Sequence, residues 1–228
     1  MKSTANNIDI LFEDNHIIII NKRSGDLVQG DKTGDAPLSD ILKEYLKIKY
    51  NKPGNVYLGV VHRLDRPTTG IVIFAKTSKA LERLNKMLRN KEIDKTYWAV
   101  VKNKPTKRKE TLINYLRKNP KNNKATVFNK ETKDSKKAVL HYKILSSLTN
   151  YHLLEIDLET GRHHQIRAQL SHIKCPIKGD LKYGFPRSNK DAGIHLHAKK
   201  IQFIHPVSKE LLKIEAPTPK DPIWDACN

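Results

Sequence analysis

The sequence is poor in cysteine and in long apolar stretches. Its two cysteines, Cys175 and Cys227, do not form a Cys-x-x-Cys motif. They are too few to staple a secreted fold, so we expect a reducing compartment. The apolar runs, such as Ile17–Ile20, are far shorter than the roughly 20 residues of a membrane span. We therefore expect a soluble, cytoplasmic protein that makes no membrane contact.

Cofactor and metal motifs are also missing. The sequence contains neither Gly-x-Gly-x-x-Gly nor Gly-x-x-x-x-Gly-Lys-[Ser/Thr], which disfavours a nucleotide cofactor. His163-His164 and His195-Leu196-His197 invite a metal hypothesis, but no His-Glu-x-x-His or carboxylate-rich ligand set accompanies them. Signatures of serine or cysteine nucleophiles are absent too. We therefore expect no cofactor and no metal.

Acidic residues are scarce relative to basic ones. The chain has 43 lysines and arginines against 24 aspartates and glutamates, a net charge of +19 that exceeds what solubility requires. Phosphate contacts by lysine and arginine release counterions and supply affinity without reading sequence. Nucleic acid is therefore the expected partner, and a merely solvated lysine-rich surface is the alternative.

Strand patterns outnumber helix patterns along the chain. Helical spacing of apolar residues predicts helices over 38–50, 78–91 and 164–172. Apolar, β-branched runs predict strands over 8–12, 17–21, 56–61, 71–75, 96–101, 112–116, 125–128, 138–145, 151–158, 194–204 and 211–214. Since short turns join most of these strands, we expect an α+β fold with a mixed, mainly antiparallel central sheet and flanking helices. We expect a single domain over 1–228, with a basic hairpin or insertion at 102–137.

The first segment with reactive side chains is His62-Arg63-Leu64-Asp65-Arg66, on an expected loop over 62–70 between two buried strands. Nearby cations keep a carboxylate ionised and able to act as a nucleophile or base. For this segment alone, a loop salt bridge without chemistry is an equally good interpretation.

Two further segments gather polar side chains. Tyr97 and Trp98 alternate along an expected strand, so they face opposite sides of the sheet, and either packing or a site lining suits one of them. Thr160–Arg167 is an expected strand-to-helix turn with two arginines and two histidines beside a helix N-terminus, which favours anion binding. Helical spacing places Arg167 next to the apolar stripe rather than opposite it.

Taken in order with Asn21–Gly25, these segments resemble the RluA-type pseudouridine synthase family. The resemblance spans nearly the whole chain and rests on His62-Arg63-Leu64-Asp65 with Thr68-Thr69-Gly70, and on Thr160-Gly161-Arg162 with His164-Gln165-Ile166-Arg167. It implies that Asp65 is the catalytic aspartate, Tyr97 the active-site tyrosine and Arg167 the basic partner of the aspartate. It also implies substrate-binding roles for His62, Arg63, Arg66, Thr68, Gly70, Arg162, Gln165, Ile166 and Lys22.

The family reaction detaches uracil from ribose, rotates it and rejoins it through C5, which needs no redox change, metal or nucleotide. The carboxylate acts either as a nucleophile at C1′ or as the base that removes the 2′ proton, and the sequence leaves both open. The target must be flipped out of the RNA, and we expect Arg63 to fill the gap. Thr69, His163 and Gln169 depart from the usual serine, threonine and histidine, but none of these changes removes a reacting group.

Only a few residues precede the first expected strand, so we expect a family member without the N-terminal S4 domain. We also expect a monomer. The expected substrate is ribosomal RNA, above all that of the large subunit, with transfer RNA as the close alternative. Alternatives from other classes are a non-catalytic RNA-binding protein on the same scaffold and a metal-dependent nuclease.

Overall fold

The computed structural model describes residues 2–31 and 33–227, which form two compact units. Unit 1 contains residues up to Asp94 together with residues 198–218, and unit 2 contains residues 95–197 and those from 219 onward. The chain therefore changes unit after Asp94, after His197 and after Thr218. None of the described helices is long and apolar enough to cross a membrane.

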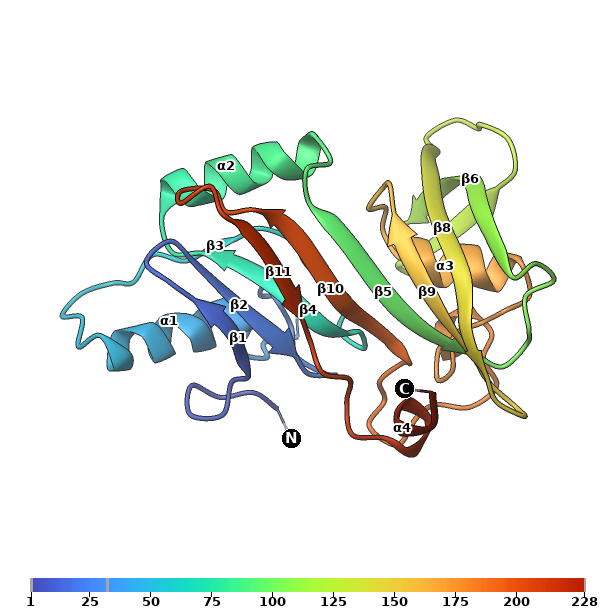
Figure 1. Cartoon of the computed structure of the whole chain (residues 1–228), viewed down its shortest axis with the longest axis horizontal. Coiled ribbons are helices and arrows are strands. Elements are labelled where there is room, and N and C mark those ends of the chain that lie inside the picture. The colour runs from blue at the N-terminus through green and yellow to red at the C-terminus, as the bar shows by residue number, and fades with distance from the viewer. Residues whose placement is uncertain (1, 32, 228) are drawn as a thin grey trace. The chain divides into compact units, whose positions relative to one another are not determined.

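Unit 1 combines a sheet with two helices (Figure 1). Its elements are β1 (Ile10–Glu13), β2 (Ile17–Lys22), α1 (Leu38–Lys49), β3 (Gly59–Val60), β4 (Thr69–Ala75), α2 (Ser78–Arg89), most of β10 (Leu196–Ile204) and β11 (Leu211–Glu215). The strands are ordered β1-β2-β4-β10, with β3 paired to β4 and β11 to β10. β2 pairs antiparallel with both β1 and β4, so β2 and β4 lie inside the sheet.

The core of unit 1 follows from the sequence pattern. All of Ile17–Ile20 and Ile71–Ala75 are buried, which suits two interior strands. α1 contributes Leu38, Leu42 and Leu46, spaced four residues apart on one helical face, to the same core cluster. The side chain of Thr77 caps α2 by accepting a hydrogen bond from the Ala80 N–H at 3.2 Å. β2, β4 and α1 thus share one packed core.

Unit 2 is built on an antiparallel sheet with helices against it (Figure 1). Its elements are β5 (Asp94–Val101), β6 (Lys109–Asn119), β7 (Lys124–Phe128), β8 (Lys136–Ser147), β9 (His152–Leu158), α3 (Gln165–His172), the 3₁₀ helix η1 (Leu181–Tyr183) and α4 (Pro222–Cys227). The strand order is β5-β9-β8-β6-β7, and every neighbouring pair is antiparallel. Ala168 of α3 packs with Leu116, Ala125 and Tyr183 in one cluster, which fixes the helix on the sheet.

The α+β class and the mainly antiparallel pairing are confirmed, while several details of the prediction are wrong. The strand expected over 56–61 is only the two-residue β3, Gly59–Val60. The predicted loop over 62–70 ends earlier, because Gly70 pairs with Lys22 and extends β4 back to Thr69. The six-residue helix α4 was not predicted, since a helix this short has too few apolar positions to show periodicity. Within the basic segment 102–137, β6 and β7 pair antiparallel.

Candidate functional site

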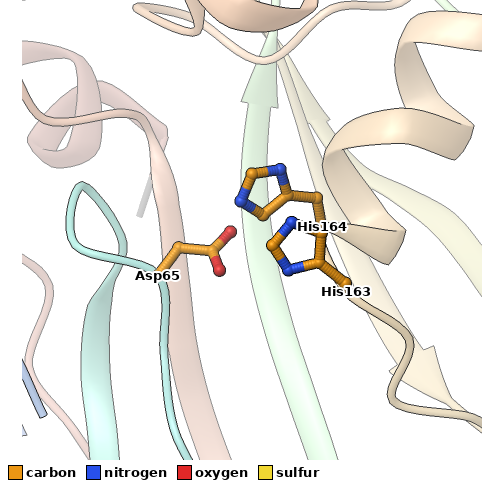
Figure 2. Close-up of side chains that lie close together, drawn as sticks. All are labelled: Asp65, His163 and His164. Atoms are coloured by element: carbon orange, nitrogen blue, oxygen red, sulfur yellow. The ribbon is translucent and has the colours of Figure 1, made fainter. Parts of the chain in front are cut away.

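Asp65 lies on the loop that joins β3 to β4 in unit 1. The Thr68 N–H donates to the Asp65 carbonyl oxygen at 3.0 Å, which closes a turn directly after the carboxylate. β3 and β4 pair with each other, with Val60 opposite Phe74, so both ends of the loop are tied to the sheet. Figure 2 shows the half-buried Asp65 side chain extending from this loop. Such a loop presents a reacting group on a rigid support.

Lys22 supports the Asp65 loop through hydrogen bonds to the loop backbone. The side chain is buried, at 1% exposure. Its ammonium donates to three backbone carbonyl oxygens, those of Arg23 (2.9 Å), Arg66 (3.0 Å) and Thr68 (2.7 Å). Burial lowers the pKa of Lys22 to about 7, although the carboxylates of Asp26 and Asp65 act in the opposite direction. Because an ammonium has three N–H donors, these contacts occupy them all and favour a positioning role over the predicted substrate contact.

The charged neighbours of Asp65 on the loop differ in their surroundings. The Ile73 N–H donates to Nε2 of His62 at 3.2 Å, so in the neutral ring the proton is on Nδ1. Arg66 forms an ion pair with Asp35. Arg63 is exposed, and its role toward RNA stays a prediction.

Gly70 is required by packing. Its φ is +107°, and a Cβ atom there would lie 2.4 Å from the Ala198 carbonyl oxygen and 2.6 Å from the Ala198 nitrogen. Both are backbone atoms of β10 and cannot move aside cheaply. Gly70 therefore lets β4 approach β10 closely, a function that its predicted substrate contact did not anticipate.

Tyr97 lies on β5 in unit 2, opposite Ile156 of β9. It is buried, whereas Trp98 is half-buried, and the pleat turns the two rings to opposite faces as expected. Lys95 shares the Tyr97 face because it stands two residues earlier, and burial lowers its pKa. One face of β5 thus carries a phenol and a desolvated amine.

Arg167 is held in α3 by a carboxylate from a later segment. It is 5% exposed, which confirms that it lies next to the core rather than in solvent. Its Nε and a terminal nitrogen donate to the two carboxylate oxygens of Asp180, at 2.7 and 2.8 Å. The guanidinium also lies over the Tyr183 ring, 5.1 Å from its centroid. These contacts fix both the orientation and the charge of Arg167.

Tyr183 connects this arginine to the turn before α3. Its hydroxyl accepts from the Ala125 N–H at 2.7 Å and is hydrogen-bonded to Nδ1 of His164 at 2.9 Å. His164 adopts a left-handed conformation, with φ of +52°, as the residue that precedes α3. Its ring stacks on that of His163 at 3.8 Å between centroids, as Figure 2 shows. The Tyr183 side chain therefore links the turn before α3, α3 itself and β7.

The other predicted site residues of this turn mostly make contacts that stabilise the fold. Gln165 is buried and joins three groups, namely Thr160 Oγ1 (2.8 Å), the Arg162 N–H (3.0 Å) and the Val139 carbonyl (3.0 Å). Ile166 is buried as well. Arg162 is exposed, and its Nε donates to the Lys137 carbonyl at 2.9 Å.

Sequence reasoning missed Asp180 and Tyr183. A signal was present, because they lie in a short polar segment bounded by Gly179 and Gly184, and both glycines have positive φ. Glycines at both ends of a short segment indicate a constrained turn. The sequence does not say which buried cation such a turn meets.

Side chains of metal-binding type occur among the motif residues. Asp65 offers a carboxylate, and His163 and His164 offer imidazoles, both of which zinc accepts. Asp65 belongs to unit 1 and the two histidines to unit 2.

Comparisons with known proteins agree with the motifs. Residues 16–172, more than half of the chain, match the family described as RNA pseudouridylate synthase. An uncharacterized RNA pseudouridine synthase of Synechocystis is 35% identical over 215 residues, which cover 93% of this chain and 66% of that protein. Ribosomal large subunit pseudouridine synthase D of Haemophilus influenzae is 35% identical over 230 residues, covering 94% and 68% respectively. The chain thus spans about two thirds of the length of these relatives.

The fold is also similar to that of a solved human structure. Human RNA pseudouridylate synthase domain containing 4 superposes with a TM-score of 0.79 at 24% identity, covering 95% of this chain and 90% of that one. At this identity the likeness concerns the fold.

Proposed function

Because the chain belongs to the RNA pseudouridylate synthase family, we propose that it isomerises uridine to pseudouridine within structured RNA. The bond between uracil N1 and ribose C1′ breaks, the base rotates, and a C5–C1′ bond forms. C5 loses a proton and N1 gains one, so the reaction consumes no other compound. The observation that carries this proposal is Asp65, a carboxylate on a loop whose carbonyls are held by the buried Lys22.

Each catalytic residue has a chemical role in the proposal. Asp65 either attacks C1′ or removes the 2′ proton. Tyr97 stacks on the uracil ring or assists removal of the C5 proton. Arg167 is the basic partner of Asp65 in this proposal.

We propose ribosomal RNA of the large subunit as the substrate. The name of the Haemophilus relative states this activity for that protein. The net charge of +19 suits a polyanion, and backbone contacts offset the cost of flipping the target base. Transfer RNA is the close alternative. We propose a monomer acting in the cytoplasm, where such RNA is available.

The test is a map of pseudouridines made by the purified protein. The chain is incubated with total RNA from cells that lack its gene, and new pseudouridines are located by sequencing. We expect a small set of modified uridines with the wild type and none with Asp65→Asn, which should still fold and bind RNA. An unmodified RNA pool, or equal modification by Asp65→Asn, would contradict the proposal.

Two alternatives predict different outcomes in the same assay. A non-catalytic RNA-binding protein would leave every uridine unchanged, and binding alone has no use for a carboxylate that repels phosphate. A metal-dependent nuclease would shorten the RNA and would stop when EDTA is added. We expect full-length RNA and modification that is insensitive to EDTA.

A further inference from the structure

A recess opens in unit 1 where the Asp65 loop begins. Its volume is about 470 Å³, which is within the usual range of ligand pockets, roughly 300–1,000 Å³. It is lined by Gln29, Ser39, Lys43, Leu58, Val60, Val61, His62 and Arg63, and we name it the flank pocket. Two of these residues, His62 and Arg63, belong to the Asp65 loop itself.

The walls of the flank pocket come from three segments that are anchored to one another. Leu58, Val60 and Val61 form an aliphatic wall along β3. Ser39 and Lys43 come from α1. The Gln29 segment is tied to the start of α1, because the Leu38 and Ser39 N–H groups donate to the carbonyls of Leu27 and Val28, at 2.7 and 3.3 Å. The pocket is thus preformed by packed elements.

We propose that the flank pocket binds one nucleotide of the RNA strand beside the target uridine. This inference rests on the proposed function and extends it to a second contact on the substrate. Arg63 and Asp65 are two residues apart, a chain distance of at most roughly 7 Å. A nucleotide held at Arg63 is therefore a near neighbour of the one that reacts at Asp65.

The lining has the chemistry that a single nucleotide requires. The aliphatic wall can cover the face of an unstacked base. The Gln29 amide both donates and accepts hydrogen bonds, so it can read a base edge. Lys43 supplies positive charge for phosphate. Lys43 contacts Asp40 at 3.3 Å between exposed side chains, a weak type of pair that a phosphate can replace.

The test uses the full chain and a pool of stem–loop RNAs, each with a uridine at a site that the wild type modifies and with randomised nucleotides on both sides. Single-turnover rates are measured for Gln29→Ala and Lys43→Gln. The matched controls are Gln202→Ala and Lys47→Gln, because both residues are exposed in unit 1 and do not line the pocket. Circular dichroism verifies that every variant is folded.

We expect Gln29→Ala to reduce the ratio of single-turnover rates between the preferred neighbouring base and the others by roughly 2- to 10-fold. This is the effect of one lost hydrogen bond. Lys43→Gln should weaken RNA binding for all sequences and reduce the salt dependence by about one phosphate contact. Neither control should do so. Folded variants that match their controls in base preference and salt dependence would overturn the flank-pocket proposal, even while the wild type makes pseudouridine. A wild type that makes none would instead overturn the proposed function.

Discussion

Arg167 and Asp180 form a buried bidentate ion pair, with nitrogen to oxygen distances of 2.7 and 2.8 Å and side-chain exposures of 5% and 1%. The pair joins α3 to the segment that begins η1. Two parallel hydrogen bonds orient the guanidinium more strictly than a point charge could. Asp180 is therefore a positioning residue for the arginine that the proposed reaction requires.

Asp180→Ala should leave a buried guanidinium without its carboxylate. Breaking one side of a buried pair costs about 3–5 kcal/mol, so we expect a large fall in the free energy of unfolding, measured in urea. Glu159→Ala is the control in the same unit. Because the Glu159–His141 pair is exposed, its loss should lower the free energy of unfolding by less than about 1 kcal/mol. Equal stability of the two variants would show that the buried pair is not needed.

Tyr183→Phe separates the two contacts of this residue. It removes the hydroxyl that meets Ala125 and His164 but keeps the ring beneath Arg167. Leaving the buried Ala125 N–H without an acceptor should cost about 1–3 kcal/mol in unfolding free energy. We expect kcat to remain near that of the wild type in Tyr183→Phe and to fall in Tyr183→Ala, which also uncovers the guanidinium. Similar kcat values for both variants would argue against a positioning role of the ring.

Gly70→Ala should prevent β4 from packing on β10. The new Cβ would lie 2.4 Å from the Ala198 carbonyl oxygen, and the positive φ adds backbone strain. We expect a strongly lowered melting temperature in calorimetry and little folded protein. Gly54→Ala is the control, because nothing lies within 4 Å of its added Cβ. A Gly70→Ala protein as stable as this control would refute the packing argument.

Lys22 should make stability depend on pH. Its pKa is lowered to about 7 in the folded state from an ordinary value of 10.5. Between these values the unfolded chain binds a proton that the folded chain does not, so unfolding free energy should rise with pH. For one proton the slope is at most about 1.4 kcal/mol per pH unit.

The measurement is urea unfolding of wild type and Lys22→Met at pH 7, 8 and 9. Groups common to both proteins cancel in the comparison. We expect the variant to be less stable at every pH, because the carbonyls of Arg23, Arg66 and Thr68 lose hydrogen bonds from Lys22, and to show a smaller rise of stability with pH. Identical slopes in the two proteins would mean that Lys22 keeps an ordinary pKa.

The sequence by itself determined the main elements and the motifs. The runs Ile17–Ile20 and Ile71–Ala75 are apolar enough to be interior strands in any fold, and the four-residue spacing in α1 predicts its buried face. The order of the motifs around Asp65 and Arg167 was enough to indicate the family. These features depend on residues close together in the chain, where periodicity and local chemistry are visible.

Only the tertiary structure decided what several motif residues contact. A lysine is ordinarily expected at the surface. In the fold, however, the Lys22 ammonium donates to carbonyl oxygens of residues more than 40 positions away in the sequence. Its burial there lowers its pKa. Gly70 acquires its role from the backbone of Ala198, and Arg167 acquires its carboxylate from Asp180. Side-chain partners across such separations are set by the packing of whole elements, which a local pattern does not encode.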